Sequence, residues 1–308
     1  MLRITGLKKS YKSFPVLRNL NMSIDRGDVY GFIGTNGCGK TTTMNIICNI
    51  IPKDDGDIAF AEGGVSIGYL PEMPALYGYM NGFEYLDFIG ACYEYAGIIK
   101  DRTREVLEIT GMLDGAKRLI KGYSRGMNQR IGIAAAIYAK PDLLILDEPT
   151  SALDPQGRAE VMEIITKLAA GGSTILLCTH ILADVERVAN KVGILRNGVM
   201  AVEGRLHDVI RQFGGATAIR VRLRYAPMPN DPLCMLDVVE RSEIDPYGLT
   251  IYAKEGVSEV ALYNHVIISL ANNNILPESI EFKRLNLEQI YLGVNNDMIR
   301  PVAPGGWY

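Results

Sequence analysis

Short blocks of apolar and polar positions fill the first part of the chain, and each block predicts one element. Residues 2–7, 20–24 and 29–33 are short apolar runs bounded by turn signals, so they predict strands. The stretch after Lys40 predicts a helix to about residue 50, because Pro52 cannot continue it. Two later runs, residues 143–146 and 174–178, are apolar throughout and predict parallel strands buried on both faces.

Between residues 73 and 140 the apolar positions recur with the period of a helix. Helices are predicted at residues 83–96, 102–110 and 131–138, and Gly111 is a suitable stop for the second. The segment 77–88 is also rich in aromatic side chains. These aromatics either fill the core of a helical lobe or line a groove that accepts a short helix of a partner.

The pattern changes after Gly204 and the pair Gly214-Gly215, which mark a boundary. Strands are predicted at residues 218–225, 249–253 and 280–285, and helices at residues 257–271 and 287–292. The first of these strands alternates apolar side chains with arginines, which is typical of a strand with one solvated face. The sequence therefore predicts two domains, residues 1–215 and 216–308, the second being a small α+β domain with a structural or regulatory role.

A glycine-rich loop follows the predicted strand at residues 29–33 and matches the pattern G-x-x-x-x-G-K-T. Glycines let such a loop curl so that its N–H groups point at phosphate oxygens, and the helix that begins near Gly39 adds positive charge. Lys40 is expected to reach the β- and γ-phosphates, and the Thr41 hydroxyl to ligate Mg²⁺. The predicted nucleotide-binding residues are Gly34, Asn36, Gly37, Cys38, Gly39, Lys40, Thr41 and Thr42.

The two apolar strands deliver polar side chains to the carboxyl edge of the sheet, where ligands bind in open α/β folds. Asp147 and Glu148 end one strand, and His180 follows the other. Asp147 can hold Mg²⁺ through its water shell, and Glu148 can act as general base on the attacking water. His180 can touch the γ-phosphate or that water, although a histidine satisfied by its surroundings is the plainer alternative.

The segment Ser124-Arg125-Gly126 precedes the helical stretch at residues 131–138. Ser124 is a good N-cap, and a glycine just inside the helix lets the backbone approach a phosphate. The segment is an ordinary helix cap, and the same cap can also bind the γ-phosphate of a second molecule's ATP.

In order and spacing, these motifs resemble the ATP-binding subunits of ABC transporters: the loop ending in GKTT, the signature YSRGMNQR, the strand ending in DEPTSALDP, and His180. The resemblance covers about residues 1–215. It implies an α/β P-loop NTPase of ABC type, with a mixed sheet core, an antiparallel β subdomain and a helical lobe at about residues 73–140. It also implies ATP hydrolysis with Mg²⁺ in a sandwich homodimer.

The same resemblance assigns further roles. Ser124 and Gly126 would contact the partner's ATP, and Asp154 would cross the dimer interface. Tyr11 aligns with the aromatic that stacks on adenine, but on physical grounds it could equally pack on the sheet. Glu72 stands where the family has a glutamine; it can still face Mg²⁺ or water, although a glutamate only accepts hydrogen bonds.

Two other features depart from the common pattern. Tyr123, Arg125 and Met127 alter the signature in a way that is similar to bacterial subunits for drug, bacteriocin and antibiotic export. Cys38 lies inside the phosphate loop, and a thiol at a helix N-terminus beside Lys40 is expected to have a lowered pKa and to react with alkylating reagents. The alternative is that the loop shields this thiol.

Composition restricts the class of protein. The 308 residues carry a formal net charge of −3 without blocks of like charge, so no nucleic-acid partner is expected. Five scattered cysteines without a C-x-x-C spacing fit a reducing cytoplasm. The first residues do not resemble a signal peptide, and no apolar run approaches the ~20 residues needed to cross a bilayer.

These expectations combine into the ATPase subunit of an exporter, peripheral on the inner face of the cell membrane and acting through a separate integral membrane permease subunit. The alternative is a soluble ABC ATPase that acts on DNA or the ribosome. The segment between Lys40 and Ser124 lacks sustained heptads, and the chain has one set of motifs, which disfavours that alternative. The cargo cannot be read, because the membrane subunit would select it.

Overall fold

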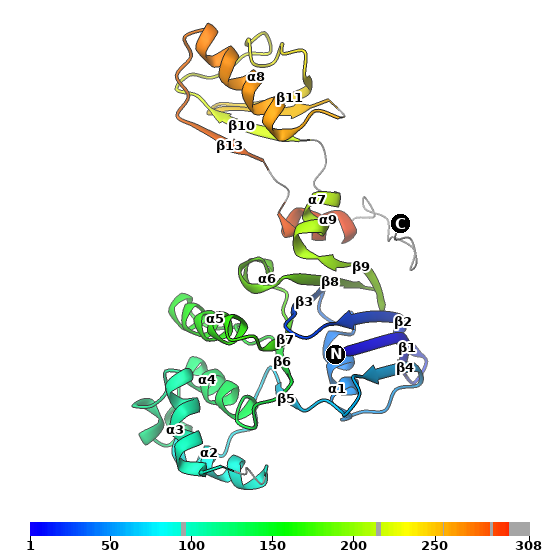
Figure 1. The fold of residues 1–308 in the computed structure, drawn as a ribbon, viewed down its shortest axis with the longest axis vertical. Coiled ribbons are helices and arrows are strands. Elements are labelled where there is room, and N and C mark those ends of the chain that lie inside the picture. The colour runs from blue at the N-terminus through cyan, green and yellow to red at the C-terminus, as the bar shows by residue number, and fades with distance from the viewer. Residues whose placement is uncertain (94–96, 214–216, 255, 284–285, 296–308) are drawn as a thin grey trace. The chain divides into compact units, whose positions relative to one another are not determined.

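The computed structural model describes residues 1–93, 97–213, 217–254, 256–283 and 286–295, and it divides into two compact units (Figure 1). The first unit contains Met1–Leu206 and the chain from Val294 onward, and the second contains His207–Gly293. The domain boundary expected after residue 215 therefore differs from the boundary between the units. The glycine pair behind that expectation, Gly214-Gly215, lies outside the described residues, whereas helix α7 (Leu206–Phe213) spans the observed division.

Within the described residues, nine strands of the first unit form one sheet in the order β4-β1-β2-β9-β8-β3-β7-β6-β5. The strands are β1 (Leu2–Tyr11), β2 (Phe14–Ile24), β3 (Val29–Gly34), β4 (Asp55–Phe60), β5 (Ile67–Leu70), β6 (Leu143–Asp147), β7 (Thr174–Cys178), β8 (Lys191–Arg196) and β9 (Val199–Arg205). Neighbours from β8 to β5 pair in parallel, whereas β4, β1 and β2 pair antiparallel. The prediction of a mixed core with an antiparallel β subdomain is confirmed.

The central strands explain where the site can form. Every residue of β3, β6 and β7 is buried, which confirms the prediction of strands covered on both faces. Because these strands are adjacent and parallel, their carboxyl ends meet at one edge of the sheet. By contrast β1 alternates buried and exposed positions, as expected for a strand with one solvated face.

Helices of the first unit are α1 (Lys40–Ile47), α2 (Gly82–Cys92), α3 (Ile99–Ile109), α4 (Arg125–Ala136), α5 (Pro155–Ala170) and α6 (Leu182–Val188), with single 3₁₀ turns at Gly115–Lys117 and Ile120–Gly122. Helix α1 ends before residue 50, because Asn49 takes a left-handed φ of 56° and turns the chain. Helix α2 begins at Gly82, because Asn81 and Glu84 form a reciprocal capping box. Residues 94–96, expected at its end, lie outside the described residues.

Helices α2, α3 and α4 gather into the predicted helical lobe (Figure 1). The buried Arg102 of α3 joins them, since its guanidinium donates to the carbonyls of Ile137 and Tyr138 just after α4. Thr103 of α3 donates to Asp87 of α2 at 2.6 Å. The lobe is therefore tied together by buried polar contacts as well as by apolar packing.

The second unit has a four-stranded antiparallel sheet, in the order β11-β12-β10-β13. Its elements are β10 (Ala218–Arg222), β11 (Val239–Asp245), β12 (Gly248–Ala253), α8 (Glu259–Asn272), β13 (Ser279–Phe282) and most of α9 (Leu287–Asn295). Ile219 and Val221 of β10 pack with Leu262 and Val266 of α8, while Arg222 is exposed on the other face. Strand β11 was not predicted, because its edge position leaves it mostly polar. No helix among the described residues is long and apolar enough to span a membrane.

Candidate nucleotide-binding site

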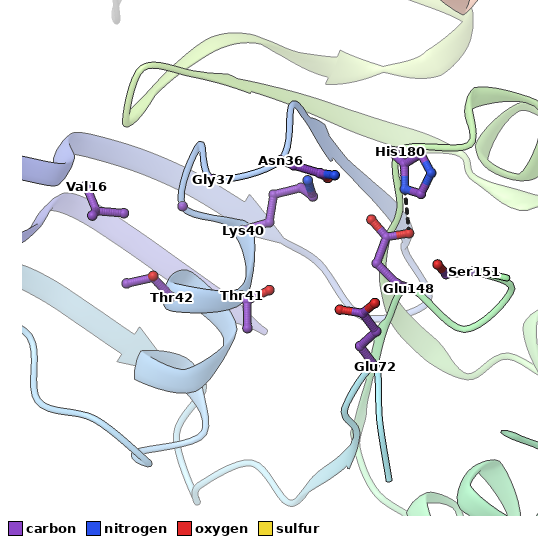
Figure 2. A pocket seen from close by; sticks show the side chains of 11 residues that line it. Val16, Asn36, Gly37, Lys40, Thr41, Thr42, Glu72, Glu148, Ser151 and His180 are labelled. Atoms are coloured by element: carbon purple, nitrogen blue, oxygen red, sulfur yellow. Dashed lines mark hydrogen bonds and ion pairs between the residues drawn. The ribbon is translucent and has the colours of Figure 1, made fainter. Parts of the chain in front are cut away.

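A cavity of about 470 Å³ lies at the carboxyl edge of the parallel strands (Figure 2). In Figure 2 the phosphate loop and the start of α1 form one wall, and the residues that follow β5, β6 and β7 form the facing wall. The lining residues are Val16, Asn36, Gly37, Gly39, Lys40, Thr41, Thr42, Glu72, Glu148, Ser151 and His180. The fold therefore brings residues that are far apart in the sequence together around this cavity.

The loop between β3 and α1 has the glycine geometry that its sequence predicts. Gly37 and Gly39 have φ values of 79° and 115°, which side-chain-bearing residues rarely adopt. A Cβ on Gly39 would also lie 2.6 Å from a methyl carbon of Leu17. Lys40 Nζ donates to the carbonyls of Gly34 at 2.7 Å and Thr35 at 3.2 Å, so its ammonium is held over the loop at the mouth of the cavity.

The facing wall carries a carboxylate paired with an imidazole. Glu148 Oε2 lies 2.9 Å from His180 Nδ1 and 3.4 Å from the Thr179 hydroxyl, which donates to it (Figure 2). Glu148 has a left-handed φ of 49°, and its N–H donates to the Cys178 carbonyl at 2.8 Å. This turn directs the Glu148 side chain into the cavity rather than along the strand.

Asp147 lies deeper, at the end of β6, and its properties fit a magnesium ligand. Its Oδ1 is buried and has no hydrogen-bond partner among the described residues. Burial raises the pKa of Asp147, the Cys178 thiol and the Thr41 hydroxyl oppose that rise, and the carboxylates of Glu148 and Glu72 add to it. A hard cation beside this oxygen and the Thr41 hydroxyl would offset the concentrated negative charge.

No group of three or more His, Cys, Asp or Glu side chains that could hold a metal ion by itself occurs in the described part of the chain.

Glu72 lines the cavity as expected, and it is connected to the signature helix. Gln129 of α4 is buried, and its Nε2 donates to the Glu72 carbonyl at 3.0 Å. The segment that carries Glu72 is therefore attached to the helical lobe through the backbone. Sequence reasoning named Glu72 but missed the contact with Gln129.

The signature residues lie at a second cavity, of about 420 Å³. Ser124 caps α4 by accepting from the Met127 N–H at 3.3 Å, and Asp154 caps α5 by accepting from the Gly157 N–H at 2.9 Å. Ser124, Gly126 and Asp154 line this cavity together with Arg125, Met127, Arg130, Ala152, Leu153, Gln156, Gly157 and Glu160. Most of the predicted site residues thus line one or the other of these two cavities, whereas Tyr11, Gly34, Cys38 and Asp147 belong to neither lining.

Cys38 is buried in the phosphate loop. Burial raises the pKa of the Cys38 thiol, and this outweighs the opposing effects of Lys40 and of the backbone N–H groups. The expected lowered pKa is therefore wrong, and the alternative of a shielded thiol describes the buried Cys38. Tyr11 is exposed at the end of β1 rather than packed on the sheet, but within the described residues it is not part of the cavity lining.

Comparison with known proteins identifies the family. The ABC transporter sequence family matches residues 17–151. The linearmycin resistance ATP-binding protein LnrL of Bacillus subtilis (strain 168) is 31% identical over 316 aligned residues, which cover 97% of this chain and 100% of that protein. The chain belongs to the ABC transporter family.

Other similar proteins are also ATP-binding subunits of transporters. The lantibiotic transport ATP-binding protein SrtF of Streptococcus pyogenes is 38% identical to this ABC ATPase over 209 residues, covering 66% of the chain and 90% of SrtF. A solved structure described as the ATP-binding subunit of an ABC transporter matches with a TM-score of 0.60 and 31% identity, covering 69% of this chain and 93% of that one. The ABC ATPase is therefore an ATP-binding, ATP-hydrolysing subunit that powers transport, and the soluble alternative is not favoured.

Proposed function

We propose that this ABC ATPase powers export through a separate membrane-spanning subunit, and that it works as a homodimer with ATP sandwiched between subunits. The observation that carries the proposal is the cavity itself. It holds a phosphate-binding loop on one wall and the Glu148–His180 pair on the other. A γ-phosphate held by Lys40 would therefore face the carboxylate and the imidazole across the cavity.

The division of work follows from the chemistry of each side chain. Lys40 and the loop N–H groups hold the phosphates, and Asn36, Gly37, Gly39 and Thr42 shape the cavity around them. Glu148 accepts the proton of the attacking water, and His180 orients Glu148 and the γ-phosphate. Thr41 and Asp147, with Glu72 beside them, would hold Mg²⁺, which when bound would neutralise charge on the phosphates.

The separation of the two cavities supports the homodimer. The cavity with Lys40 and the cavity with Ser124, Gly126 and Asp154 have different linings on one chain. In the proposed dimer, an ATP held by the first cavity would be contacted by the helix N-terminus at the second cavity of the other subunit. Tyr11, exposed at the end of β1, is available to stack on adenine.

The attachment to a membrane subunit is supported by the aromatic segment of the helical lobe. The ring of Tyr77 contacts the rings of Tyr79, Tyr85 and Phe88 at centroid distances of 5.8, 6.1 and 5.7 Å. Tyr85 is only 7% exposed and belongs to the lobe core, whereas Tyr79 is 71% exposed. The outer rings form an apolar surface that suits a short helix of a membrane partner, which would keep the ATPase at the inner face of the membrane.

The relatives give the class of cargo that we propose. LnrL is named for linearmycin resistance and SrtF for lantibiotic transport. These roles support antibiotic-like or peptide cargo for this transporter as well.

The decisive experiment replaces Glu148 by Gln, which keeps the shape of the side chain but removes the base. Turnover is expected to fall by roughly 10²–10⁴-fold, while ATP still binds and locks the chain as a dimer. Steady-state ATPase assays and light scattering with ATP measure both effects. The matched control is Glu163→Gln, at an exposed carboxylate of α5.

Two outcomes would contradict the proposal. Near-normal turnover in Glu148→Gln would remove Glu148 from the base role, and a chain that stays monomeric with ATP bound would remove the sandwich dimer.

A second experiment tests the membrane partner. A tagged form of the chain, extracted gently from native membranes, is expected to co-purify with a multi-span membrane protein in stoichiometric amount. Recovery with ribosomes or DNA instead would favour the soluble alternative.

A further inference from the structure

The segments that carry Glu148 and His180 are joined a second time by the buried carboxylate of Asp184. Asp184 is the third residue of α6, the helix that follows His180. Its Oδ2 accepts from the Thr150 hydroxyl at 2.6 Å, and its Oδ1 accepts from Arg158 Nε and Nη2 at 2.9 and 2.7 Å. Thr150 and Asp184 are only 2% and 4% exposed, so this is an interior connection.

The same carboxylate holds both ends of the loop that separates the two cavities. Thr150 immediately precedes residues 151–154, and Arg158 lies in the first turn of α5, which follows them. Ser151 lines the cavity with Lys40, and Ala152, Leu153 and Asp154 line the cavity with Ser124. A single side chain on α6 therefore fixes a loop that borders both halves of the nucleotide site.

The backbone around Thr150 needs such an anchor. Glu148 and Ala152 have φ values of 49° and 51°, and Thr150 lies between them. A residue other than glycine in the left-handed region is strained and persists only where its surroundings enforce it. The Thr150–Asp184 hydrogen bond is a buried side-chain contact that lies between these two turns.

The charge of Asp184 matters as well as its shape. A buried carboxylate is tolerated when charged and hydrogen-bonding groups surround it, and here a guanidinium and a hydroxyl do so. On the other side of the same two segments, Glu148 contacts His180 and Thr179. The segment with Glu148 and Thr150 is thus joined to the segment with His180 and Asp184 at two points.

We propose that Asp184 is a positioning residue for ATP hydrolysis, which holds the Glu148 turn and residues 151–154 in register with His180. It touches neither ATP nor the attacking water; it acts through Thr150 and Arg158. The proposal rests on the base role of Glu148 proposed above. Because the loop with Lys40 binds phosphate without Asp184, loss of Asp184 should slow turnover and leave nucleotide binding intact.

The test compares kcat and KM for ATP in the full chain. Asp184→Asn removes the charge at constant size and is expected to lower kcat by roughly ten- to a hundredfold, as small displacements of catalytic groups do, with KM changed less than about twofold. Thr150→Val, which removes the hydroxyl, is expected to lower kcat, and Thr150→Ser to restore it. Glu163→Gln serves as control, because its ion pair with Lys167 lies on the surface of α5.

A double-mutant cycle and the melting temperature separate positioning from loss of folding. If Thr150 and Asp184 act as one unit, the double variant Thr150→Val, Asp184→Asn is expected to be about as slow as Asp184→Asn alone. All rates are measured well below the Tm of each variant. Normal kcat in Asp184→Asn overturns the proposal, and so does a Thr150→Ser variant as slow as Thr150→Val.

Glu148→Gln measured in parallel distinguishes this proposal from the one on which it rests. An inactive Glu148→Gln with a fully active Asp184→Asn removes only the positioning role. Normal turnover in Glu148→Gln removes the base role, and the positioning role with it. A fall of kcat in both variants at unchanged KM for Asp184→Asn supports both.

Discussion

The two compact units differ in the charged residues that lie on their sheets. In the first unit, Asp147, Glu148 and Asp184 are buried at the carboxyl edge of the sheet, next to backbone in the left-handed region. In the second unit, Glu243 and Lys283 lie on the sheet face opposite the apolar core, where both contact Tyr252 and remain partly exposed. Burying a carboxylate costs stability unless charged or hydrogen-bonding groups compensate it, whereas charges on a solvated face cost little.

This difference indicates which unit carries out hydrolysis. The second unit packs an ordinary two-layer core, from Ile219, Val221, Leu249 and Ile251 against Leu262 of α8. Its ionic contacts are at the surface and serve the fold. We therefore expect damage to its core to affect stability far more than turnover.

The largest effect should come from Leu262→Ala. Removing a fully buried leucine from a core costs about 2–5 kcal/mol, because apolar contacts are lost and a cavity remains. Urea unfolding followed by circular dichroism should show one transition shifted to lower urea, while ATP turnover stays within about twofold of the parent.

The control is Val260→Ala at an exposed position of the same helix, which should shift neither quantity. Loss of turnover in Leu262→Ala, under conditions where the first unit remains folded, would contradict the comparison. It would mean that the second unit takes part in hydrolysis.

Much of the fold could be predicted from local pattern. The strands at residues 143–147 and 174–178 are uninterrupted apolar runs, and the structure has them almost residue for residue. Strand β11 escaped prediction because an edge strand with a solvated face has little apolar periodicity. The end of α1 was placed too late, because Pro52 suggested a stop although Asn49 had already turned the chain.

The site was predictable where its residues belong to a local motif. Lys40, Glu148 and His180 each follow a strand within a recognisable motif, and the structure brings them to one cavity. The contacts of Asp184 with Thr150 and Arg158 join residues 34 and 26 positions apart, so no local pattern announces them. The shielding of Cys38 depends on burial by the folded loop, which the sequence does not display.

A smaller effect concerns the thiols of the first unit. Burial raises the pKa of Cys38, and it raises the pKa of the half-buried Cys48 to about 11, whereas Cys92 is exposed. Since a raised pKa leaves less thiolate at neutral pH, and burial also limits access, N-ethylmaleimide should modify Cys92 faster than Cys38. Peptide mass spectrometry after timed labelling measures both rates.

The internal control is Cys48, which should also react slowly. Labelling of Cys38 as fast as Cys92 would contradict the effect of burial and restore the expectation of a reactive loop thiol. Labelling of all three should accelerate as the pH rises, because the thiolate is the reacting form.

The smallest effect should come from the surface ion pairs of the second unit. The Arg241 guanidinium at 2.6 Å, then the Tyr252 hydroxyl and Lys283, lower the pKa of Glu243 to about 2. The unfolded chain has a glutamate pKa of about 4.3, so this carboxylate stabilises the fold above about pH 4.3 and loses that contribution as the pH falls toward 2. Because Glu243 is half exposed, Glu243→Gln should cost at most about 1 kcal/mol at pH 7.

The measurement is the urea midpoint of the transition that Leu262→Ala shifts, taken at pH 7 and at pH 3. The difference between parent and Glu243→Gln should shrink at the lower pH, and high salt should reduce it at pH 7 because exposed charges are screened. Glu240→Gln, at another exposed position of β11, is the matched control. A cost of several kcal/mol for Glu243→Gln, or one independent of pH, would mean that Glu243 behaves like the buried carboxylates of the first unit.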